Sequence, residues 1–316
     1  MTAISTTPTE ARRGHRSQRL ILHVFSTFAV GGSQVRFCQI ANALGDRFSH
    51  AVIAMDSCTD AAQLIESHVP VTVMPTPDAA GPLPRRLLRY RRLLSALQPD
   101  CMVTYNWGAI EWAMARLWGG PRHVHVEDGF GPDEADRQLP RRVAVRRLVL
   151  NRGSTLVVPS RVLKRLAREH WQIAPERIVY LPNGIDCDRY LRPPDPVLLE
   201  TLKIPRSTPL IGTVAALRPE KNLVRLIDAV SRLSASRDAH RVLIGDGPQR
   251  TELEERAKAA GMAGGITFAG HQPKPEALLG ALQIFALSSD TEQMPISVLE
   301  AMAAERVIAA VDVGDV

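Results

Sequence analysis

Residues 285–302 read FALSSDTEQMPISVLEAM, and this stretch predicts a strand, a loop and a helix in succession. The apolar residues 285–287 are typical of the end of a buried strand. Pro295 suits the first turn of a helix, where its missing N–H costs nothing. Glu292 then lies in the loop after the strand, and Glu300 projects from the helix about one and a half turns beyond its start.

The start of this helix is a natural site for an anion, because its first N–H groups have no partners within the helix and its dipole favours negative charge. We therefore assign ligand contacts to Met294, Pro295 and Ile296. One acid beside a sugar, one beside a ribose and a diphosphate between them would form a pocket for a nucleotide-activated sugar. The plainer interpretation is an exposed loop acid and an ordinary glutamate on a surface helix.

The chain alternates short apolar runs with segments of helical periodicity, which predicts mostly parallel, doubly wound α/β sheets. We expect a disordered segment at residues 1–18, a Rossmann-like domain at 19–195 and a second one at 196–316. The boundary follows from the proline-rich segment 192–196. Open sheets of this kind bind ligands at the carboxyl ends of their strands, and every candidate motif falls at such an end.

The composition is that of an ordinary soluble globular protein, with 45% hydrophobic and 23% charged residues. No apolar run reaches the length of about 18 residues that a membrane-spanning helix needs, and the first residues lack the pattern of a secretory signal. The four cysteines lie far apart, which disfavours a zinc or redox site and suits a reducing cytoplasm. The net charge of +6 suits anionic partners, but no nucleic-acid-binding signature accompanies it.

Two cations follow the first strand of the second domain. Arg218 and Lys221 lie in a loop that leads into a helix. Arginine can hold a diphosphate through paired N–H bonds, and lysine acts as a point charge. A solvated basic loop is the plainer alternative. Further along, Gly245 and Gly247 form a strand-to-helix turn that marks the fold and offers donor contacts, and His271 follows a strand whose end would approach the nucleotide base.

The first domain offers two candidate motifs. Gly31 and Gly32 form a tight strand-to-helix turn, where glycine lets the backbone come close to a ligand, although a simple turn explains them equally well. Residues 123–129 end a strand, and alternation places His123 and His125 on the same face of it. His125 is a candidate to bind a sugar hydroxyl or the acceptor, with a structural role as the equal alternative. Ligands this close together on one strand argue against a metal site.

A strongly basic helix is predicted at residues 85–97, with leucines at helical spacing. Such a face can bind anionic lipid, and a second basic run at 141–147 adds to this. The plainer interpretation, which we favour, has the leucines in the core and the arginines in water.

Taken together, these motifs resemble those of the retaining family 4 glycosyltransferases, which have the GT-B fold. The resemblance extends from about Leu20 to Val316. It rests on the E-x7-E stretch and on the order and spacing of Gly31-Gly32, Pro182–Asp186, Arg218–Asn222 and Ile244–Pro248. It implies two Rossmann-like domains, of which the second is incomplete, because members of the family continue with further strand–helix units where this chain reaches Val316.

The resemblance also implies roles for individual residues. Glu292 matches the position that contacts the donor sugar hydroxyls, and Glu300 matches the one that binds the ribose. Arg218 and Lys221 would hold the departing diphosphate, and His125 would lie near the donor sugar. The double glycine would lie near the donor phosphate and the acceptor, although the family often has Glu where this chain has Gln34.

We therefore expect a metal-independent retaining hexosyltransferase that moves a sugar from a nucleotide-sugar to a glycan or lipid-linked acceptor, without a further cofactor and without nucleic acid as a partner. It would act in polysaccharide or glycolipid synthesis in the cytoplasm, at the inner face of the membrane. A non-catalytic, sugar-nucleotide-binding remnant is the alternative, because Glu305 and Val307 stand where the family has Gly and Pro. A sugar-nucleotide epimerase of the same overall fold suits the E-x7-E context less well.

Overall fold

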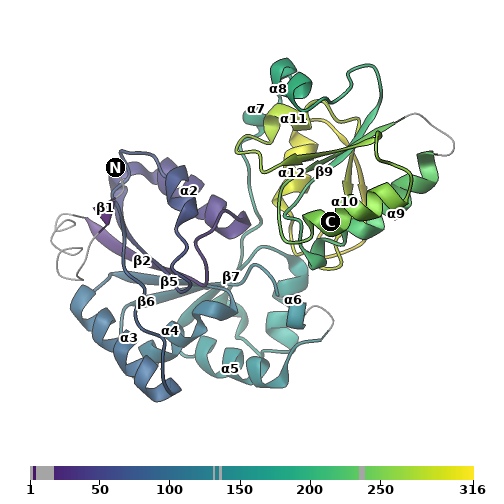
Figure 1. The fold of residues 1–316 in the computed structure, drawn as a ribbon. Helices are drawn as coiled ribbons and strands as arrows, with labels where there is room; N and C mark the ends of the chain where they lie inside the picture. Colours follow the sequence, from purple (N-terminus) through teal and green to yellow (C-terminus); the bar gives the residue numbers. More distant parts are fainter. Residues whose placement is uncertain (1–2, 5–17, 131, 135–136, 235–238) are drawn as a thin grey trace. The chain divides into compact units, whose positions relative to one another are not determined.

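The computed structural model describes residues 3–4, 18–130, 132–134, 137–234 and 239–316. The chain divides into two compact units, Met1–Pro182 and Asn183–Val316 (Figure 1). Each unit has its own parallel sheet with helices on both faces, which is the doubly wound α/β architecture that the sequence predicts.

The sheet of the first unit has strands in the order β1-β4-β3-β2-β5-β6-β7-β8, all of them parallel. Their bounds are β1 (Ala3–Ile4), β2 (Arg19–Phe25), β3 (Phe48–Ala54), β4 (Val71–Val73), β5 (Cys101–Tyr105), β6 (Arg122–Val126), β7 (Ser154–Val158) and β8 (Ile178–Tyr180). The order reverses beside β2, and at such a switch point the loops at the carboxyl ends of neighbouring strands diverge and leave room for a ligand.

The helices of the first unit are α2 (Gly32–Leu44), α3 (Leu83–Leu97), α4 (Ile110–Ala115), α5 (Pro140–Leu150) and α6 (Arg161–Glu169). Strand β2 shows how they are divided between the two faces of the sheet. Its residues Leu22 and Val24 belong to the core formed with α3 and α4, whereas Phe25 packs in the core that includes Phe37 of α2. The alternation of side chains along one strand therefore builds a core on each face.

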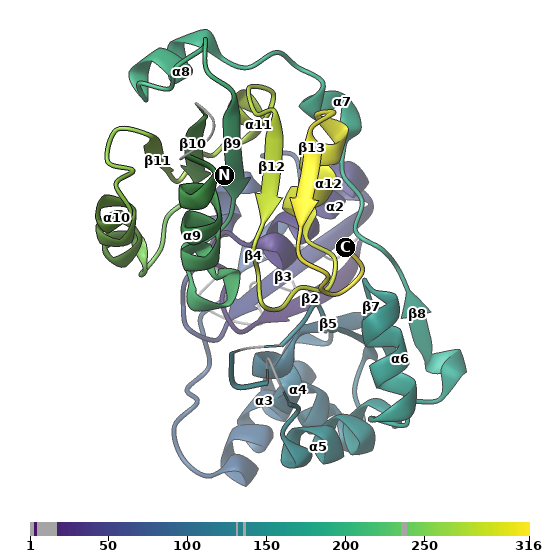
Figure 2. The same cartoon turned by 90° about the vertical axis from the view of Figure 1, so that its right-hand side faces the viewer.

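The second unit has a parallel sheet in the order β11-β10-β9-β12-β13. The strands are β9 (Leu210–Val214), β10 (His240–Ile244), β11 (Ile266–Gly270), β12 (Ile284–Leu287) and β13 (Val307–Ala310), and the arrowheads of β12 and β13 point the same way in Figure 2. The helices are α7 (Cys187–Tyr190), α8 (Pro196–Thr201), α9 (Leu223–Ser234), α10 (Arg250–Ala259), α11 (Glu276–Leu279) and α12 (Ile296–Ala303). One core lies under α9 and α10, and the other under α7, α8, α11 and α12.

The break between the units falls after Pro182, earlier than the predicted boundary at 195/196. Helix α7 packs against α12, and Tyr190, which is 3% exposed, belongs to the same core as Phe285 and Ala301. The proline-rich segment itself starts α8, where the Asp195 side chain accepts hydrogen bonds from the first N–H groups of the helix. The prolines correctly indicate a local change of chain direction. The buried contacts of Tyr190, however, place residues 183–195 in the second unit.

Two local details differ from the sequence analysis. Pro295 is the residue before α12 rather than its first turn, and the helix begins at Ile296. In the N-terminal segment predicted to be disordered, Ala3–Ile4 pair with β4, and residues 1–2 and 5–17 lie outside the described residues. Among the helices in the described part of the chain, none has the length and hydropathy of a bilayer-crossing segment.

Candidate functional site

Lys221 and Glu292 meet in the second unit. Lys221 ends a short 3-10 turn that follows β9, and Glu292 lies in the loop that follows β12. These strands are neighbours and parallel, so the loops at their carboxyl ends lie side by side. Lys221 Nζ is 2.5 Å from Glu292 Oε1, and the Ser289 hydroxyl donates to the same oxygen at 2.8 Å. The Glu292 side chain is only 11% exposed, so this ion pair is partly shielded from water.

Further hydrogen bonds join the same two loops. The Asp290 N–H donates to the Glu220 carbonyl at 3.0 Å, and the Ser288 hydroxyl donates to the Lys221 carbonyl at 3.0 Å. The Asp290 carboxylate also accepts from the Asn222 amide and from the Arg225 guanidinium. The backbone around Lys221 and Glu292 is therefore held in place from several directions.

Arg218 lies at the start of the same turn, and its carbonyl accepts from the Lys221 N–H at 3.0 Å. Its side chain is exposed, and its guanidinium makes no hydrogen bond or ion pair with the described residues. The three residues predicted to act on the donor thus lie at one edge of the second sheet. Two of them are paired, and Arg218 keeps its N–H donors for another partner.

Glu300 projects from α12 and contacts Tyr190 of α7. The Tyr190 hydroxyl donates to Glu300 Oε1 at 2.6 Å. Burial raises the pKa of Glu300, while the hydrogen bond from Tyr190 and the nearby charge of Arg189 act in the opposite direction. Burial and the same carboxylate raise the pKa of Tyr190, so the phenol keeps its proton and remains the donor. No local pattern in the sequence predicts that Tyr190 contacts Glu300, because the two residues lie 110 positions apart in the chain.

The turn before α12 is held by Asn183. The Asn183 side-chain amide donates to the Met294 carbonyl at 2.7 Å, and its backbone N–H lies 3.2 Å from Met294 Sδ. Pro295 and Ile296 follow directly, so the free N–H groups at the start of α12 come immediately after this turn. The backbone of Met294 is thus fixed by a residue of the Asn-Gly-Ile-Asp stretch.

Gly245 and Gly247 have a structural explanation. Gly245 has a φ of +141°, and a Cβ added to it would lie 1.9 Å from the Ala215 carbonyl oxygen. A Cβ on Gly247 would lie 2.6 Å from the Leu217 carbonyl oxygen. Both glycines let the loop after β10 pack directly on the backbone after β9. His271 is exposed next to Gly270, and donor contacts of His271 and of both glycines stay predictions.

In the first unit, the double glycine begins α2. Gly31 precedes the helix, Gly32 is its first residue, and the Ser33 hydroxyl donates to Asp128 Oδ2 at 2.6 Å. Arg36 also donates to Asp128, at 2.9 Å. Asp128 follows β6, so it ties the end of that strand to the start of α2. Asp128 was considered only as part of a metal cluster and was not predicted as a site residue, although its place directly after a strand was a signal.

His125 lies inside the sheet and has no exposed surface. Its Nδ1 is 2.7 Å from Thr104 Oγ1, which also lies 2.9 Å from His123 Nε2, so the prediction that both histidines share one face is confirmed. His125 Nε2 is 3.5 Å from Glu127 Oε2, and the buried Arg146 donates to that same oxygen at 3.1 Å. Contact between His125 and the donor sugar stays a prediction. The buried Glu127 and the partly exposed Asp128 follow directly after the strand.

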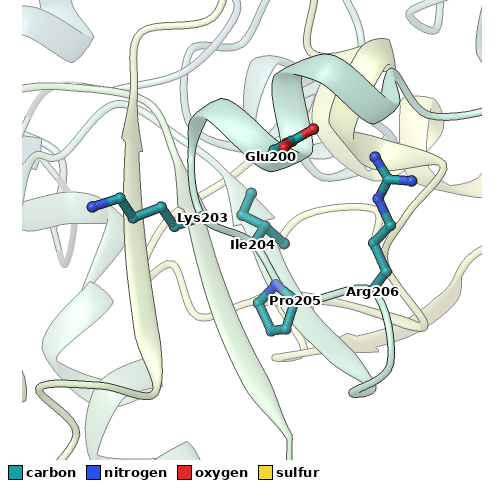
Figure 3. A pocket seen from close by; sticks show the side chains of 5 residues that line it. All are labelled: Glu200, Lys203, Ile204, Pro205 and Arg206. Carbon is teal, nitrogen blue, oxygen red and sulfur yellow. The ribbon is translucent and has the colours of Figure 1, made fainter.

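One open pocket of the second unit lies away from all these residues. It has a volume of about 410 Å³ and is lined by Glu200, Lys203, Ile204, Pro205 and Arg206 (Figure 3). These residues precede β9, at the amino end of the strand rather than the carboxyl end. None of the candidate residues lines it, so we do not identify it with the site.

Two family models match the chain. Residues 30–189 match glycosyltransferase family 4, and residues 197–316 match the glycosyl transferases group 1. The 2-deoxystreptamine glucosyltransferase of Streptomyces kanamyceticus is 33% identical over 214 residues, which cover 63% of this chain and 55% of that protein. The chain thus matches little more than half the length of this relative. The putative glycosyltransferase EpsF of Bacillus subtilis is 25% identical over 305 residues, covering 91% of this chain and 77% of EpsF.

Solved structures show the same fold. HepE from Anabaena, in complex with UDP and glucose, superposes with a TM-score of 0.78 at 20% identity, over 94% of this chain and 82% of HepE. The two doubly wound units are those of the GT-B fold. Because the family model covers half of the sequence and the fold agrees with it, the chain belongs to glycosyltransferase family 4.

Proposed function

We propose that the protein is a retaining, metal-independent hexosyltransferase that uses a nucleotide-sugar donor. The observation that carries this is the partly buried pair of Lys221 and Glu292 at the carboxyl edge of the second sheet. The exposed Arg218 begins the same turn, and its guanidinium has no partner among the described residues. Membership of the family and the fold shared with HepE support the proposal. Because HepE was solved with UDP, a uridine diphosphate sugar is the donor to test first.

Lys221 would contact both the donor diphosphate and Glu292, the acid expected to bind the sugar. An ammonium group has three N–H donors, and Glu292 accepts from one of them in the structure. The others remain for the donor diphosphate, while the second oxygen of Glu292 can accept from a sugar hydroxyl. Negative charge builds on the diphosphate as the bond to the sugar breaks. Lys221 and Arg218 would stabilise that charge. Such electrostatic stabilisation of the transition state usually lowers the activation barrier more than any other effect.

The acceptor would enter on the face that the diphosphate leaves, so no carboxylate nucleophile is needed. The protein would then act mainly by holding donor and acceptor in the reactive orientation. Glu300 would bind the ribose hydroxyls, and the backbone at Met294, Pro295 and Ile296 would face the diphosphate. Contacts of Gly31 and Gly32 with the donor phosphate or the acceptor stay predictions.

For the acceptor we propose a glycan or a lipid-linked sugar in polysaccharide or glycolipid synthesis. One relative is named for 2-deoxystreptamine, a cyclitol with two amino groups, and an acceptor of that class is the alternative. The net charge of +6 disfavours a cationic acceptor and favours an anionic or membrane-bound one. Incubation of the enzyme and donor with 2-deoxystreptamine, or with a lipid-linked monosaccharide, distinguishes the two classes by which one becomes glycosylated.

We further propose that the protein acts in the cytoplasm, at the inner face of the membrane. Helix α3 favours this, because Arg85, Arg91 and Arg92 are exposed while Arg86 and Arg89 are paired with Glu111 and Asp78. Helix α4 packs on both α3 and α5, and α5 adds the exposed Arg141 and Arg147. A surface rich in exposed arginine can bind anionic lipid headgroups.

The deciding experiment measures release of UDP from UDP-glucose, UDP-galactose and UDP-N-acetylglucosamine, with acceptor present. We expect donor-dependent release that is abolished by Arg218→Ala and by Glu292→Ala. Arg232→Ala, which removes an exposed arginine of α9, is the control and should retain activity. Nucleotide-sugar binding without turnover would instead support the non-catalytic remnant, and unchanged activity in both variants would contradict the site.

A further inference from the structure

We propose that Tyr190 is a positioning residue that orients the Glu300 carboxylate toward the ribose of the donor. The inference rests on the proposed function, because it takes Glu300 as the ribose-binding acid. Tyr190 lies outside the E-x7-E motif, on helix α7, which precedes the second sheet in the sequence.

The geometry of the pair carries this proposal. The Tyr190 hydroxyl donates to Glu300 Oε1 at 2.6 Å, a length typical of a charge-assisted O–H···O bond. A phenol has one proton to donate, so it can fix only one of the two oxygens. Among the described residues, Glu300 Oε2 has no hydrogen-bond partner, and it remains available for a pair of vicinal hydroxyls.

Tyr190 can hold this position because its own ring is fixed. The side chain is buried among Phe285, Leu279 and Ala301 in one core of the second unit. Its neighbour Arg189 makes a two-pronged ion pair with Glu276 of α11, at 2.8 and 3.0 Å. Helix α7 is therefore anchored on α11 while it contacts α12, and the hydroxyl has little freedom to leave Glu300.

The hydrogen bond from Tyr190 also affects the ionisation of Glu300. Glu300 is only partly exposed, and this burial raises the pKa of its carboxyl. The hydrogen bond from Tyr190 and the charge of Arg189 oppose that effect and favour the carboxylate. An ionised Glu300 can accept from the Tyr190 hydroxyl with Oε1 and from the ribose hydroxyls with Oε2, whereas a protonated one would offer fewer acceptor sites.

The segment that bears Tyr190 also reaches the other end of α12. Asn183 donates to the Met294 carbonyl at 2.7 Å, directly before the helix. Residues 183–190 thus contact both the turn expected to face the diphosphate and the acid expected to face the ribose. Residues 183–190 would therefore hold helix α12, the expected donor-binding helix, in position.

The test uses Tyr190→Phe, which keeps the buried ring and removes only the hydroxyl. Titration calorimetry of the full chain measures affinity for UDP and for 2′-deoxy-UDP, which lacks one of the two ribose hydroxyls. ADP and GDP with their 2′-deoxy forms serve in the same way if one of them is the nucleotide that binds. We expect the wild type to prefer the ribonucleotide, and Tyr190→Phe to reduce that preference roughly tenfold while affinity for the deoxynucleotide changes little.

Two further measurements separate positioning from a general effect on the fold. In a Glu300→Gln background, Tyr190→Phe should cause no additional loss of ribose preference. In the wild type, the preference should disappear on acidification as Glu300 becomes protonated, and in Tyr190→Phe it should disappear at a higher pH. Tyr180→Phe, on β8 of the first unit, is the matched control and should leave the preference unchanged.

Undiminished ribose preference in Tyr190→Phe would overturn the inference while leaving Glu300 as a ribose ligand. A wild-type protein that binds UDP and 2′-deoxy-UDP equally would overturn both the role of Tyr190 and that of Glu300. Absence of binding to all the nucleotides would contradict the proposed function itself.

Discussion

Lys221 Nζ lies 2.5 Å from Glu292 Oε1, although the two residues follow different strands of the second sheet. The pair joins the cation expected to hold the diphosphate to the acid expected to hold the sugar. The donor would therefore bind to two side chains that already hold each other in place. This saves the cost of orienting both side chains when the donor arrives.

Glu292→Gln should lower turnover roughly a hundredfold, because it removes the charge that both positions Lys221 and binds the sugar hydroxyls. Glutamine has nearly the same shape, so the loop should stay folded. Release of UDP at saturating donor measures the effect. Asp228→Asn removes an exposed acid paired with Arg256 and should leave turnover unchanged. Equal loss in the two variants would contradict the assignment.

Glu305→Gly should stabilise the second unit by about 0.5–1 kcal/mol. Glu305 is exposed and has a φ of +61°, a left-handed conformation that costs an L-residue about 1–2 kcal/mol. The greater freedom of glycine in the unfolded chain offsets part of the gain. The resemblance places Gly at this position in the family, and the backbone shows why. Urea unfolding of Glu305→Gly and Glu305→Ala checks this, and an equal gain from alanine would contradict it.

Arg146→Met should destabilise the first unit by about 3–5 kcal/mol, because it leaves Glu127 and Glu134 buried without their shared cation. Arg146 is fully buried, donates to both acids, and lies over the rings of Trp107 and Trp171. Arg147→Met, at an exposed position on the same helix, is the control and should change stability little. Chemical denaturation at neutral pH gives the comparison.

The pH dependence of that difference has a defined sign. Burial would raise the pKa of Glu134, but the hydrogen bonds from Arg146 and Arg142 outweigh it, and the pKa lies below the ordinary value of 4.5. A carboxyl whose pKa is lower in the folded state stabilises the fold above the unfolded pKa and loses that effect as the pH falls through the folded one. The gap between wild type and Arg146→Met should therefore be largest at neutral pH and shrink below about pH 4.5. A constant gap between pH 7 and pH 3 would show that the ion pairs are not its source.

Replacement of Arg85, Arg91 and Arg92 by glutamine should weaken binding to anionic vesicles roughly a hundredfold, at about 1 kcal/mol for each arginine. Co-sedimentation with phosphatidylglycerol vesicles at physiological salt measures the effect, and neutral phosphatidylcholine vesicles give the background.

The control for this variant replaces exposed arginines of the second unit at Arg192, Arg206 and Arg232, which removes the same net charge. If both triple variants lose the same affinity, binding depends on total charge and α3 has no special role. Binding that persists in the α3 variant would favour the plainer interpretation, in which those arginines are only solvated.

Local patterns in the sequence were enough to predict much of the fold. Strict alternation along residues 123–125 placed both histidines on one face, because successive side chains of a strand point to opposite sides. The strand, loop and helix around Glu292 and Glu300 also follow from local periodicity and from Pro295. These features depend only on neighbours in the chain, so a single sequence is sufficient to determine them.

The partners of the candidate residues could not be obtained this way. Lys221 with Glu292, Tyr190 with Glu300, and Ser33 with Asp128 each join residues that lie far apart in the sequence. Such pairs depend on which strands are neighbours in a sheet and on which helices cover it. The periodicity of the sequence predicts neither the strand order nor the placement of the helices. The division after Pro182 has the same cause, because the burial of Tyr190 against α12 outweighs the local signal of the prolines. The sequence by itself determined the elements and their chemistry, and long-range packing decided which of those groups meet.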